Sequence, residues 1–332
     1  MAENKTSFQT ILDALLNDNK DFPPRYLHFF SDIDSASLKS FLDVWSRVNP
    51  TRQLILLRQL EALAETDTIV SFENLGRALL KDADGNVRAA AIRLLAESDD
   101  PKLADAYINI LQKDTELEPR LEAANMLGEY VILGELEELD ETTRCEIEDA
   151  LLAIVSGKED DRLRRRALEA VGYSSRPEVE TVIETAFTRV SPEWIASALT
   201  AMGHSADPQW EEQIVTMLVN EDLRIRKAAV QAAGELALSD TRGLLLGMLE
   251  EEEDDEIIAA IIWSLSQIGG EDVRTYLEAL LDQTEDEEAL EHLENAIENL
   301  TFTEDLERFE MLALDPDDEL KEIDLEKLDD DE

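Results

Sequence analysis

The side chains that most often carry out chemistry are few and scattered in this sequence. Cys145 is the only cysteine, and the three histidines, His28, His204 and His292, lie far apart along the chain. A zinc site needs His or Cys ligands at short spacings such as HExxH, and a nucleophilic cysteine needs a histidine partner. Neither pattern is present, and the phosphate-binding and nucleophile motifs GxxxxGK[ST], GxGxxG and GxSxG are absent as well. The sequence therefore predicts no catalytic residues, no metal site and no cofactor.

Charge, in contrast, is abundant and strongly one-sided. The chain has 78 acidic and 30 basic side chains, which gives a formal net charge of -48. Such a surface repels phosphate backbones and anionic membranes, so neither nucleic acid nor a membrane is an expected partner. It attracts basic proteins and would raise their association rates. The alternative is that the acidity only provides solubility or suits a salty cytoplasm.

One basic cluster stands out against this background. The stretch DRLRRRALEA, residues 161–170, contains Arg162, Arg165 and Arg166 in addition to an arginine of the repeat described below. Guanidinium groups gathered in this way could seat a carboxylate or a phosphate. The alternative is that they pair with the acidic residues next to them at 159–161.

The elements that position these residues follow from a repeated phrase. NEDLRIRKAAVQAAGEL, at 220–236, closely resembles DADGNVRAAAIRLLAE, at 82–97. Aligning all copies on one position, here called the anchor, gives spacings of 31, 32 or 44 residues. The anchors are Val87, Pro119, Leu163, Trp194, Ile225, Ile257 and Ala289. A weaker copy begins near residue 52. This period is typical of a helical hairpin.

The local chemistry of each copy agrees with a hairpin. An acidic residue or a serine stands three residues before each anchor, where it can cap a helix. Small or apolar residues at three, four, seven and eight positions after the anchor form one face to bury. Pro101, Pro177 and Pro208 lie fourteen residues after their anchors, where proline suits the first turn of a helix. We expect one helix from two residues before to ten after each anchor, then a turn and a second helix, with the copies stacked.

The phrase resembles the HEAT repeat, in the short form named after phycobiliprotein lyases. The resemblance is carried by an acid four residues before an arginine, in Asp84 with Arg88, Asp160 with Arg164, and Asp222 with Arg226. It covers roughly residues 52–315 and implies an all-α, right-handed α-solenoid of about eight stacked helical hairpins. It also implies ladders of acid and arginine between stacked repeats. The arginine is missing at 195, 258 and 290, which leaves the ladder open to question in the C-terminal half.

Three parts of the chain depart from the repeat. Residues 1–50 hold seven of the 18 aromatic residues and are expected to form a helical N-terminal cap, with a docking module as the alternative. Within the solenoid, 51–314, an insertion near 134–145 is expected to form a loop that either binds a partner or is merely tolerated. The tail, 315–332, has 11 acids and two lysines. It is expected to be disordered, and either binds a basic partner or only improves solubility.

Side chains two, six and ten residues after an anchor lie opposite the buried face of the first helix. If these helices line the concave surface, as in similar repeat proteins, the side chains form a groove. The expected partner-binding residues are Arg165, Tyr173, His204, Trp263 and Gln267. Trp263 is the outlier among them, and exposed Trp, Tyr and Arg are enriched in binding hot spots. The alternative for Trp263 is packing between adjacent repeats.

The sequence thus predicts a non-enzymatic scaffold or adaptor that binds another protein, with charge favouring a basic one. The resemblance also implies a rival, a chromophore lyase-like protein or another HEAT-repeat enzyme auxiliary, which would need a pigment-binding pocket. A repair glycosylase for alkylated DNA, a further rival built from such repeats, would need a basic face, and the charge of -48 opposes it.

The composition also favours a cytoplasmic location. No basic segment followed by an apolar run opens the chain, and no uninterrupted apolar stretch reaches the length of a membrane span. A single thiol forms no internal disulfide, which is usual in a reducing compartment.

Overall fold

The computed structural model describes residues 7–98 and 100–313 of the 332-residue chain. All regular secondary structure in these ranges is helical, and they contain no strand. The chain divides into two compact units, Met1–Val190 and Ser191–Glu332. The all-α fold expected from the sequence is therefore confirmed.

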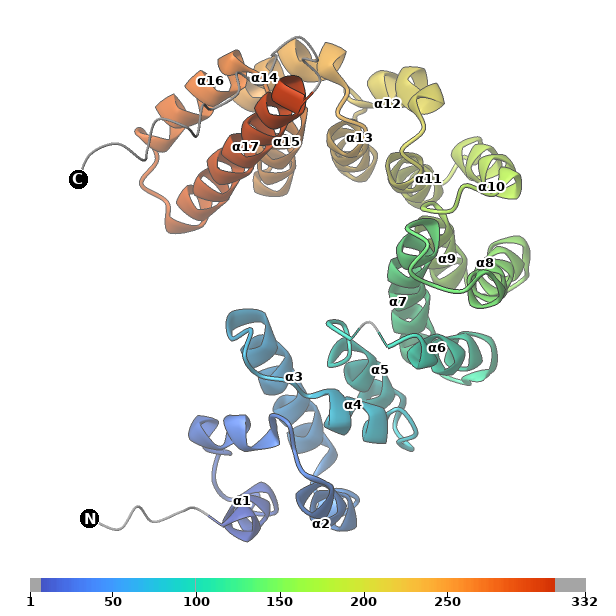
Figure 1. The fold of residues 1–332 in the computed structure, drawn as a ribbon, viewed down its shortest axis with the longest axis vertical. Helices are drawn as coiled ribbons and strands as arrows, with labels where there is room; N and C mark the ends of the chain where they lie inside the picture. The colour runs from blue at the N-terminus through green and yellow to red at the C-terminus, as the bar shows by residue number, and fades with distance from the viewer. Residues whose placement is uncertain (1–6, 99, 314–332) are drawn as a thin grey trace, which may run out of the picture. The chain divides into compact units, whose positions relative to one another are not determined.

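The first unit is a short N-terminal segment followed by helical hairpins in chain order (Figure 1). Its helices are α1 (Phe8–Leu15), η1 (Pro24–Phe30), α2 (Ser35–Trp45), α3 (Pro50–Thr66), α4 (Glu73–Leu79), α5 (Gly85–Arg93), α6 (Lys102–Lys113), α7 (Leu117–Glu135), α8 (Glu141–Ser156), α9 (Asp161–Val171) and α10 (Pro177–Phe187). The first helix of each hairpin is here called an anchor helix. In this unit the anchor helices are α3, α5, α7 and α9.

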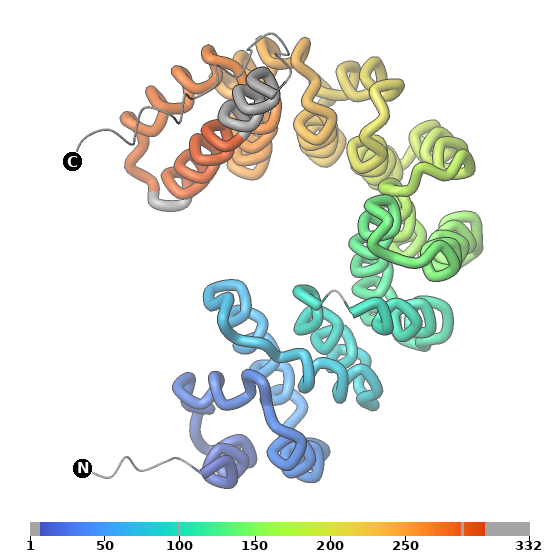
Figure 2. Tube along the Cα trace, in the orientation of Figure 1, coloured from blue at the N-terminus to red at the C-terminus, as the bar shows by residue number. Residues whose placement is uncertain are grey.

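The second unit repeats the same plan, which can be followed along the tube in Figure 2. Its helices are α11 (Pro192–His204), η2 (Pro208–Trp210), α12 (Glu211–Met217), α13 (Leu223–Glu235), η3 (Ser239–Thr241), α14 (Arg242–Glu251), α15 (Asp255–Ile268), α16 (Glu271–Leu281) and α17 (Glu287–Ala313). The anchor helices are α11, α13, α15 and α17. In the described residues, seven hairpins and α17 agree with the expected number of about eight repeats.

The anchor helices begin where the repeat pattern predicts. From α5 to α15, each starts two residues before its anchor. Glu116 in front of α7 and Ser191 in front of α11 make no side-chain cap hydrogen bond. In front of α5, α9, α13 and α15 an aspartate supplies the cap: Asp84 Oδ1 accepts the backbone N–H of Asn86 at 2.8 Å, and Asp222 Oδ1 accepts that of Arg224 at 3.1 Å. Each cap satisfies a backbone donor that has no partner within the helix.

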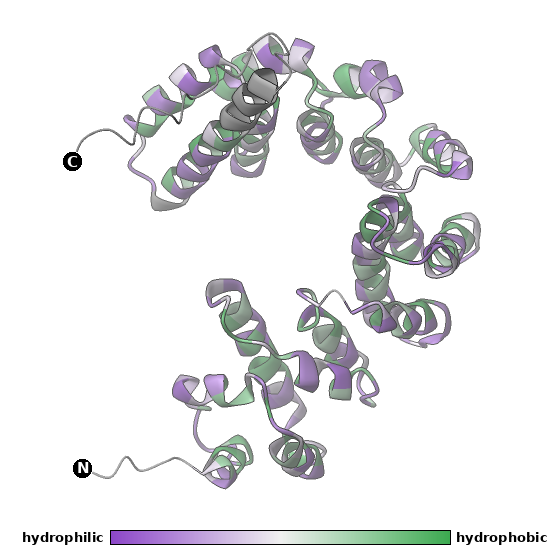
Figure 3. Cartoon of the chain, viewed as in Figure 1, coloured by the Kyte–Doolittle hydropathy of each residue, from purple (hydrophilic) through white to green (hydrophobic). Residues whose placement is uncertain are grey.

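Small residues bring neighbouring anchor helices close together. In α13, Ala228, Ala229, Ala232 and Ala233 are buried, as the sequence pattern predicts. Gly234 follows them, and a Cβ at that position would lie only 2.7 Å from Cα of Ser264 in α15. Most helices carry one hydrophobic and one hydrophilic side (Figure 3), which is the pattern that stacked hairpins require.

The arginine ladder implied by the HEAT resemblance is present, but its closest acceptors differ from the cap acids. Arg88 pairs with Asp114 at 2.6 Å, and Arg226 pairs with Glu252 at 3.0 Å. Each of these acceptors lies two residues before the cap of the next anchor helix. The cap acid Glu116 also lies 3.4 Å from Arg88, and it makes no side-chain cap hydrogen bond. The Arg226 pair also extends the ladder into the second unit.

The insertion near 134–145 lengthens two helices, and the expectation of a loop there was wrong. α7 continues to Glu135, and α8 begins at Glu141, so only a short turn separates them. Val131 and Gly134 in the extension are buried, which gives the extra turns of α7 a packing role. Apolar residues at helical spacing favoured continuation of the helix over a loop.

The aromatic residues near the N-terminus pack on one another. Phe30 contacts Phe8, Phe22 and Phe41 with ring centroids 5.6 to 6.3 Å apart, and it is fully buried. This segment also bonds to the first hairpin, because Gln53 Nε2 donates to the carbonyl of Trp45 at 2.7 Å. The structure therefore places a small aromatic core against α3.

Among the described residues, none of the helices combines the length and the hydropathy needed to cross a membrane. The acidic tail, 315–332, lies outside the described residues.

Candidate protein-binding surface

The side chains that project from the anchor helices away from their buried faces form what is here called the anchor-helix surface. One hollow in each unit lies between neighbouring anchor helices of the described residues. In each of these hollows one helix contributes the residue six positions after its anchor, which is Arg93 in α5 and Trp263 in α15.

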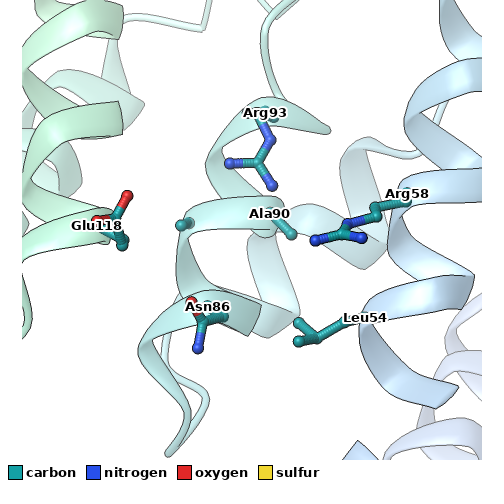
Figure 4. A pocket seen from close by; sticks show the side chains of 7 residues that line it. Leu54, Arg58, Asn86, Ala90, Arg93 and Glu118 are labelled. Atoms are coloured by element: carbon teal, nitrogen blue, oxygen red, sulfur yellow. The ribbon is translucent and has the colours of Figure 1, made fainter. Parts of the chain in front are cut away.

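The hollow of the first unit has a volume of about 190 Å³ and is lined mainly by charged side chains and small residues. Its lining residues are Leu54 and Arg58 from α3, Asn86, Ala89, Ala90 and Arg93 from α5, and Glu118 from α7. Figure 4 shows Leu54 and Arg58 pointing from α3 toward α5. The alanines leave the space that the longer side chains surround.

Arg93 is held in place by acids from the helices on either side. Its guanidinium lies 3.2 Å from Glu61 of α3 and 2.6 Å from Glu122 of α7. Burial raises the pKa of Glu61, although hydrogen bonding from Arg93 opposes the increase. The first unit thus supplies both the cation and its carboxylate partners at this position.

The hollow of the second unit is larger, at about 330 Å³, and the described residues of its lining include neither a carboxylate nor an arginine or lysine. Its lining residues are Ala259, Trp263, Ser266 and Gln267 from α15, and His292, Asn295, Ala296 and Asn299 from α17. Trp263 is 41% exposed, whereas the chain's other tryptophans are at most 5% exposed. Tryptophan is one of the residue types that are enriched in binding hot spots.

Hydrogen bonds hold the wall of this hollow. Asn299 Nδ2 donates to the carbonyl and to Oγ of Ser266, both at 3.2 Å. Ser266 Oγ in turn donates to the carbonyl of Trp263 at 2.7 Å. The backbone that carries the indole is therefore tied to the neighbouring helix, which reduces the ordering that binding would require.

A titratable pair lies elsewhere on the anchor-helix surface of the second unit. Nε2 of His204, at the end of α11, is 3.7 Å from Oε1 of Glu235, at the end of α13. Burial raises the pKa of Glu235 to about 7. The carboxyl of Glu235 stands over Gly203, where a Cβ would collide with it.

The structure brings only two of the five expected binding residues together. Trp263 and Gln267 line the same hollow, while His204 pairs with Glu235. Arg165 and Tyr173 belong to the first unit and line neither hollow. Tyr173 also lies beyond the end of α9, so its expected place on that helix was wrong.

The basic cluster is mostly neutralised by nearby acids. Arg162 lies 3.5 Å from Asp160, and Arg166 lies 2.9 Å from Glu169. Arg165 is half-buried and makes no ion pair within the described residues.

Sequence reasoning missed residues contributed by neighbouring helices. His292 lies three positions after its anchor, and Arg58 belongs to the weakest copy of the repeat. The repeat pattern shows which side of one helix is exposed, but not which neighbour's side chains meet there. Asn295 and Asn299, six and ten positions after their anchor, are the neighbouring residues that this register does identify.

Comparison with known proteins supports the architecture. The family described as HEAT repeats matches residues 72–141 and 180–265. No curated protein matches this sequence. Among solved structures, E. coli YibA is 14% identical with a TM-score of 0.42, over 86% of this chain and 99% of YibA. Yeast importin-beta (Kap95p) is 12% identical with a TM-score of 0.44, over 88% of this chain and 46% of that chain.

Kap121p is 13% identical with a TM-score of 0.40, over 94% of this chain and 40% of its own. This chain thus spans nearly all of YibA and less than half of the Kap95p or the Kap121p chain. At such identities the likeness concerns the fold alone. The repeated helical hairpins and the two matched regions together show that this chain contains HEAT repeats.

Proposed function

We propose that this chain is a non-enzymatic scaffold or adaptor that binds another protein on its anchor-helix surface. The observation that carries the proposal is the 41% exposure of Trp263 at the hollow between α15 and α17. Burying an exposed indole in a partner's contact is favourable, and residues of this kind often contribute more than about 2 kcal/mol to binding.

The proposed partner presents a basic segment. The net charge of -48 speeds the approach of cations and opposes nucleic acids and anionic membranes. The amide groups of Gln267 and Asn295 each offer a donor and an acceptor, which match the backbone of a peptide segment. We place the protein in the cytoplasm, where its single thiol would remain reduced.

The proposal is tested by recovering partners from native lysate on the full chain and on two variants. Trp263→Ala removes the exposed indole, and Phe29→Ala is its matched control, because Phe29 is 42% exposed in the N-terminal segment. We expect wild type and Phe29→Ala to retain the same proteins and Trp263→Ala to lose them. Raising the salt concentration should release them from wild type.

Two outcomes would contradict the proposal. If Trp263→Ala keeps its partners but unfolds more easily, the indole serves packing between repeats. If Phe29→Ala loses the partners instead, the N-terminal segment is the docking module. Melting temperatures of all three proteins separate loss of binding from loss of folding.

A further inference from the structure

The two units differ strongly in their numbers of lysine and arginine side chains. Of the 30 lysines and arginines, 22 precede Ser191 and eight follow it, whereas the acidic residues number 37 and 41. The structure describes the side chains of five of those eight. Each forms an ion pair within its own unit: Arg224 with Glu193, Arg226 with Glu252, Lys227 with Glu256, Arg242 with Asp272, and Arg274 with Glu278.

The first unit shows how a guanidinium occupies this surface. Arg93 projects from the sixth position after its anchor and bridges acids of the two neighbouring helices. In the second unit the same position of α15 is Trp263, and the described residues that line the hollow beside it include no arginine or lysine. The surface there has an aromatic face, amide oxygens, the imidazole of His292 and a strongly negative surrounding unit.

We infer that the hollow beside Trp263 binds the guanidinium group of an arginine side chain in the partner's segment. This inference rests on the proposed function and specifies its ligand chemistry. The planar guanidinium stacks on the indole and donates hydrogen bonds to the side-chain oxygens of Gln267 and Asn295. The acidic residues of the unit add long-range attraction.

The lining favours arginine over lysine. The described lining residues include no carboxylate to replace the tightly held water of a compact ammonium group. A guanidinium is more weakly hydrated and presents a flat face that matches an indole. An acidic ligand is opposed by the surrounding charge, and a purely apolar ligand would leave the amides of Gln267 and Asn295 without partners.

Tryptophan fluorescence can follow binding at this hollow, because only one of the four tryptophans is well exposed to solvent. Trp45, Trp194 and Trp210 are 5%, 3% and 3% exposed, so acrylamide quenching of the full chain reports mainly on Trp263. The probes are short blocked peptides in which glycine alternates with arginine, lysine or citrulline. Citrulline keeps the shape of arginine and removes its charge. Each peptide is titrated into wild type, Trp263→Leu and the matched control Phe29→Leu.

We expect the arginine peptide to protect Trp263 from acrylamide and to bind about fivefold more tightly than the lysine peptide, with citrulline weakest. Binding to Trp263→Leu, followed by calorimetry, should lose the preference for arginine, while Phe29→Leu retains it. Equal binding of arginine and lysine, or a preference that survives in Trp263→Leu, would overturn the inference. If Trp263→Ala still loses partners from lysate in that case, the proposed function stands without this ligand.

Discussion

Arg93 and Trp263 occupy the same position in their repeats, six residues after the anchor, yet they meet different surroundings. Arg93 is fixed between two carboxylates of its own unit, and charged side chains of the same unit line its hollow. Trp263 is open to water, beside amide groups and the imidazole of His292. The same repeat geometry therefore serves stability in one unit and, in our proposal, recognition in the other.

Substitution of a ladder arginine should lower the free energy of unfolding in both units alike, and this is the largest effect that we expect. The side chains of Arg88 and Asp114 are only 12% and 7% exposed. Arg88→Met would leave Asp114 without its cation, and we expect a loss of about 3 kcal/mol in the free energy of unfolding, measured with urea.

Arg226→Met should cause a similar loss, because its pair with Glu252 is comparably buried. The double variant Arg88→Met with Asp114→Leu, which removes both charges, should recover much of the stability. If either single variant is as stable as wild type, the ladder is not a structural feature shared by the two units.

Arg93→Ala should lower the free energy of unfolding by about 1 to 2 kcal/mol, because Glu61 would keep its burial and lose its main hydrogen-bond donor. The effect is moderated because Arg93 itself is 40% exposed. Trp263→Ala should change stability by less than about 0.5 kcal/mol. Urea unfolding of the two variants checks the contrast, and a larger loss for Trp263→Ala would reverse the assignment of roles.

Trp263→Arg should make the second hollow resemble the first. The new guanidinium would remove the stacking face and repel an incoming arginine, so we expect binding of the arginine peptide to fall about tenfold, or about 1.4 kcal/mol. Calorimetric titration measures this loss, and Phe29→Arg controls for the added positive charge. An unchanged affinity would show that the peptide binds elsewhere.

Glu235 should make the stability of the second unit depend on pH, and this is the smallest effect that we expect. Its folded-state pKa of about 7 lies above the ordinary value of 4.5, so the folded protein holds the proton more tightly. The stability contributed by this carboxyl is therefore present at low pH and lost as the pH rises from about 4.5 through 7.

Glu235→Gln cannot lose that proton, so its stability relative to wild type should increase by about 1 kcal/mol between about pH 5 and pH 8. The carboxyl is partly open to water, which keeps the effect small. Urea unfolding of both proteins at the two pH values measures it. A relative stability that falls or stays constant would show that the carboxyl is already ionised at pH 5.

The sequence was sufficient for the features that depend on one helix. The spacing of apolar and capping residues predicted the starts of the anchor helices, the alanine face of α13 and the projection of Trp263 away from the core. Features formed between helices could not be predicted in this way. The ladder acceptors Asp114 and Glu252, and the neighbour His292 in the hollow, depend on which side chains meet across repeats.

Length changes were also difficult to predict. The extra residues of the 44-residue spacing extend α7 and α8, because the apolar residues of these helices continue at helical spacing and are buried against neighbouring helices. Tyr173 was misplaced for the opposite reason. α9 ends at Val171, before the position that the regular repeat assigns to its last turn.

The most direct test of the central claim is photo-crosslinking from position 259, which lines the hollow beside Trp263. The full chain would keep Trp263 and carry p-benzoylphenylalanine in place of Ala259, or in place of Phe29 as the control, and would be irradiated in native lysate. We predict that position 259 crosslinks to a protein that position 29 does not capture, and that the arginine peptide competes for this crosslink while the citrulline peptide does not. Equal capture from both positions, or no competition by the arginine peptide, would contradict the assignment of the hollow beside Trp263 as an arginine-binding site for a protein partner.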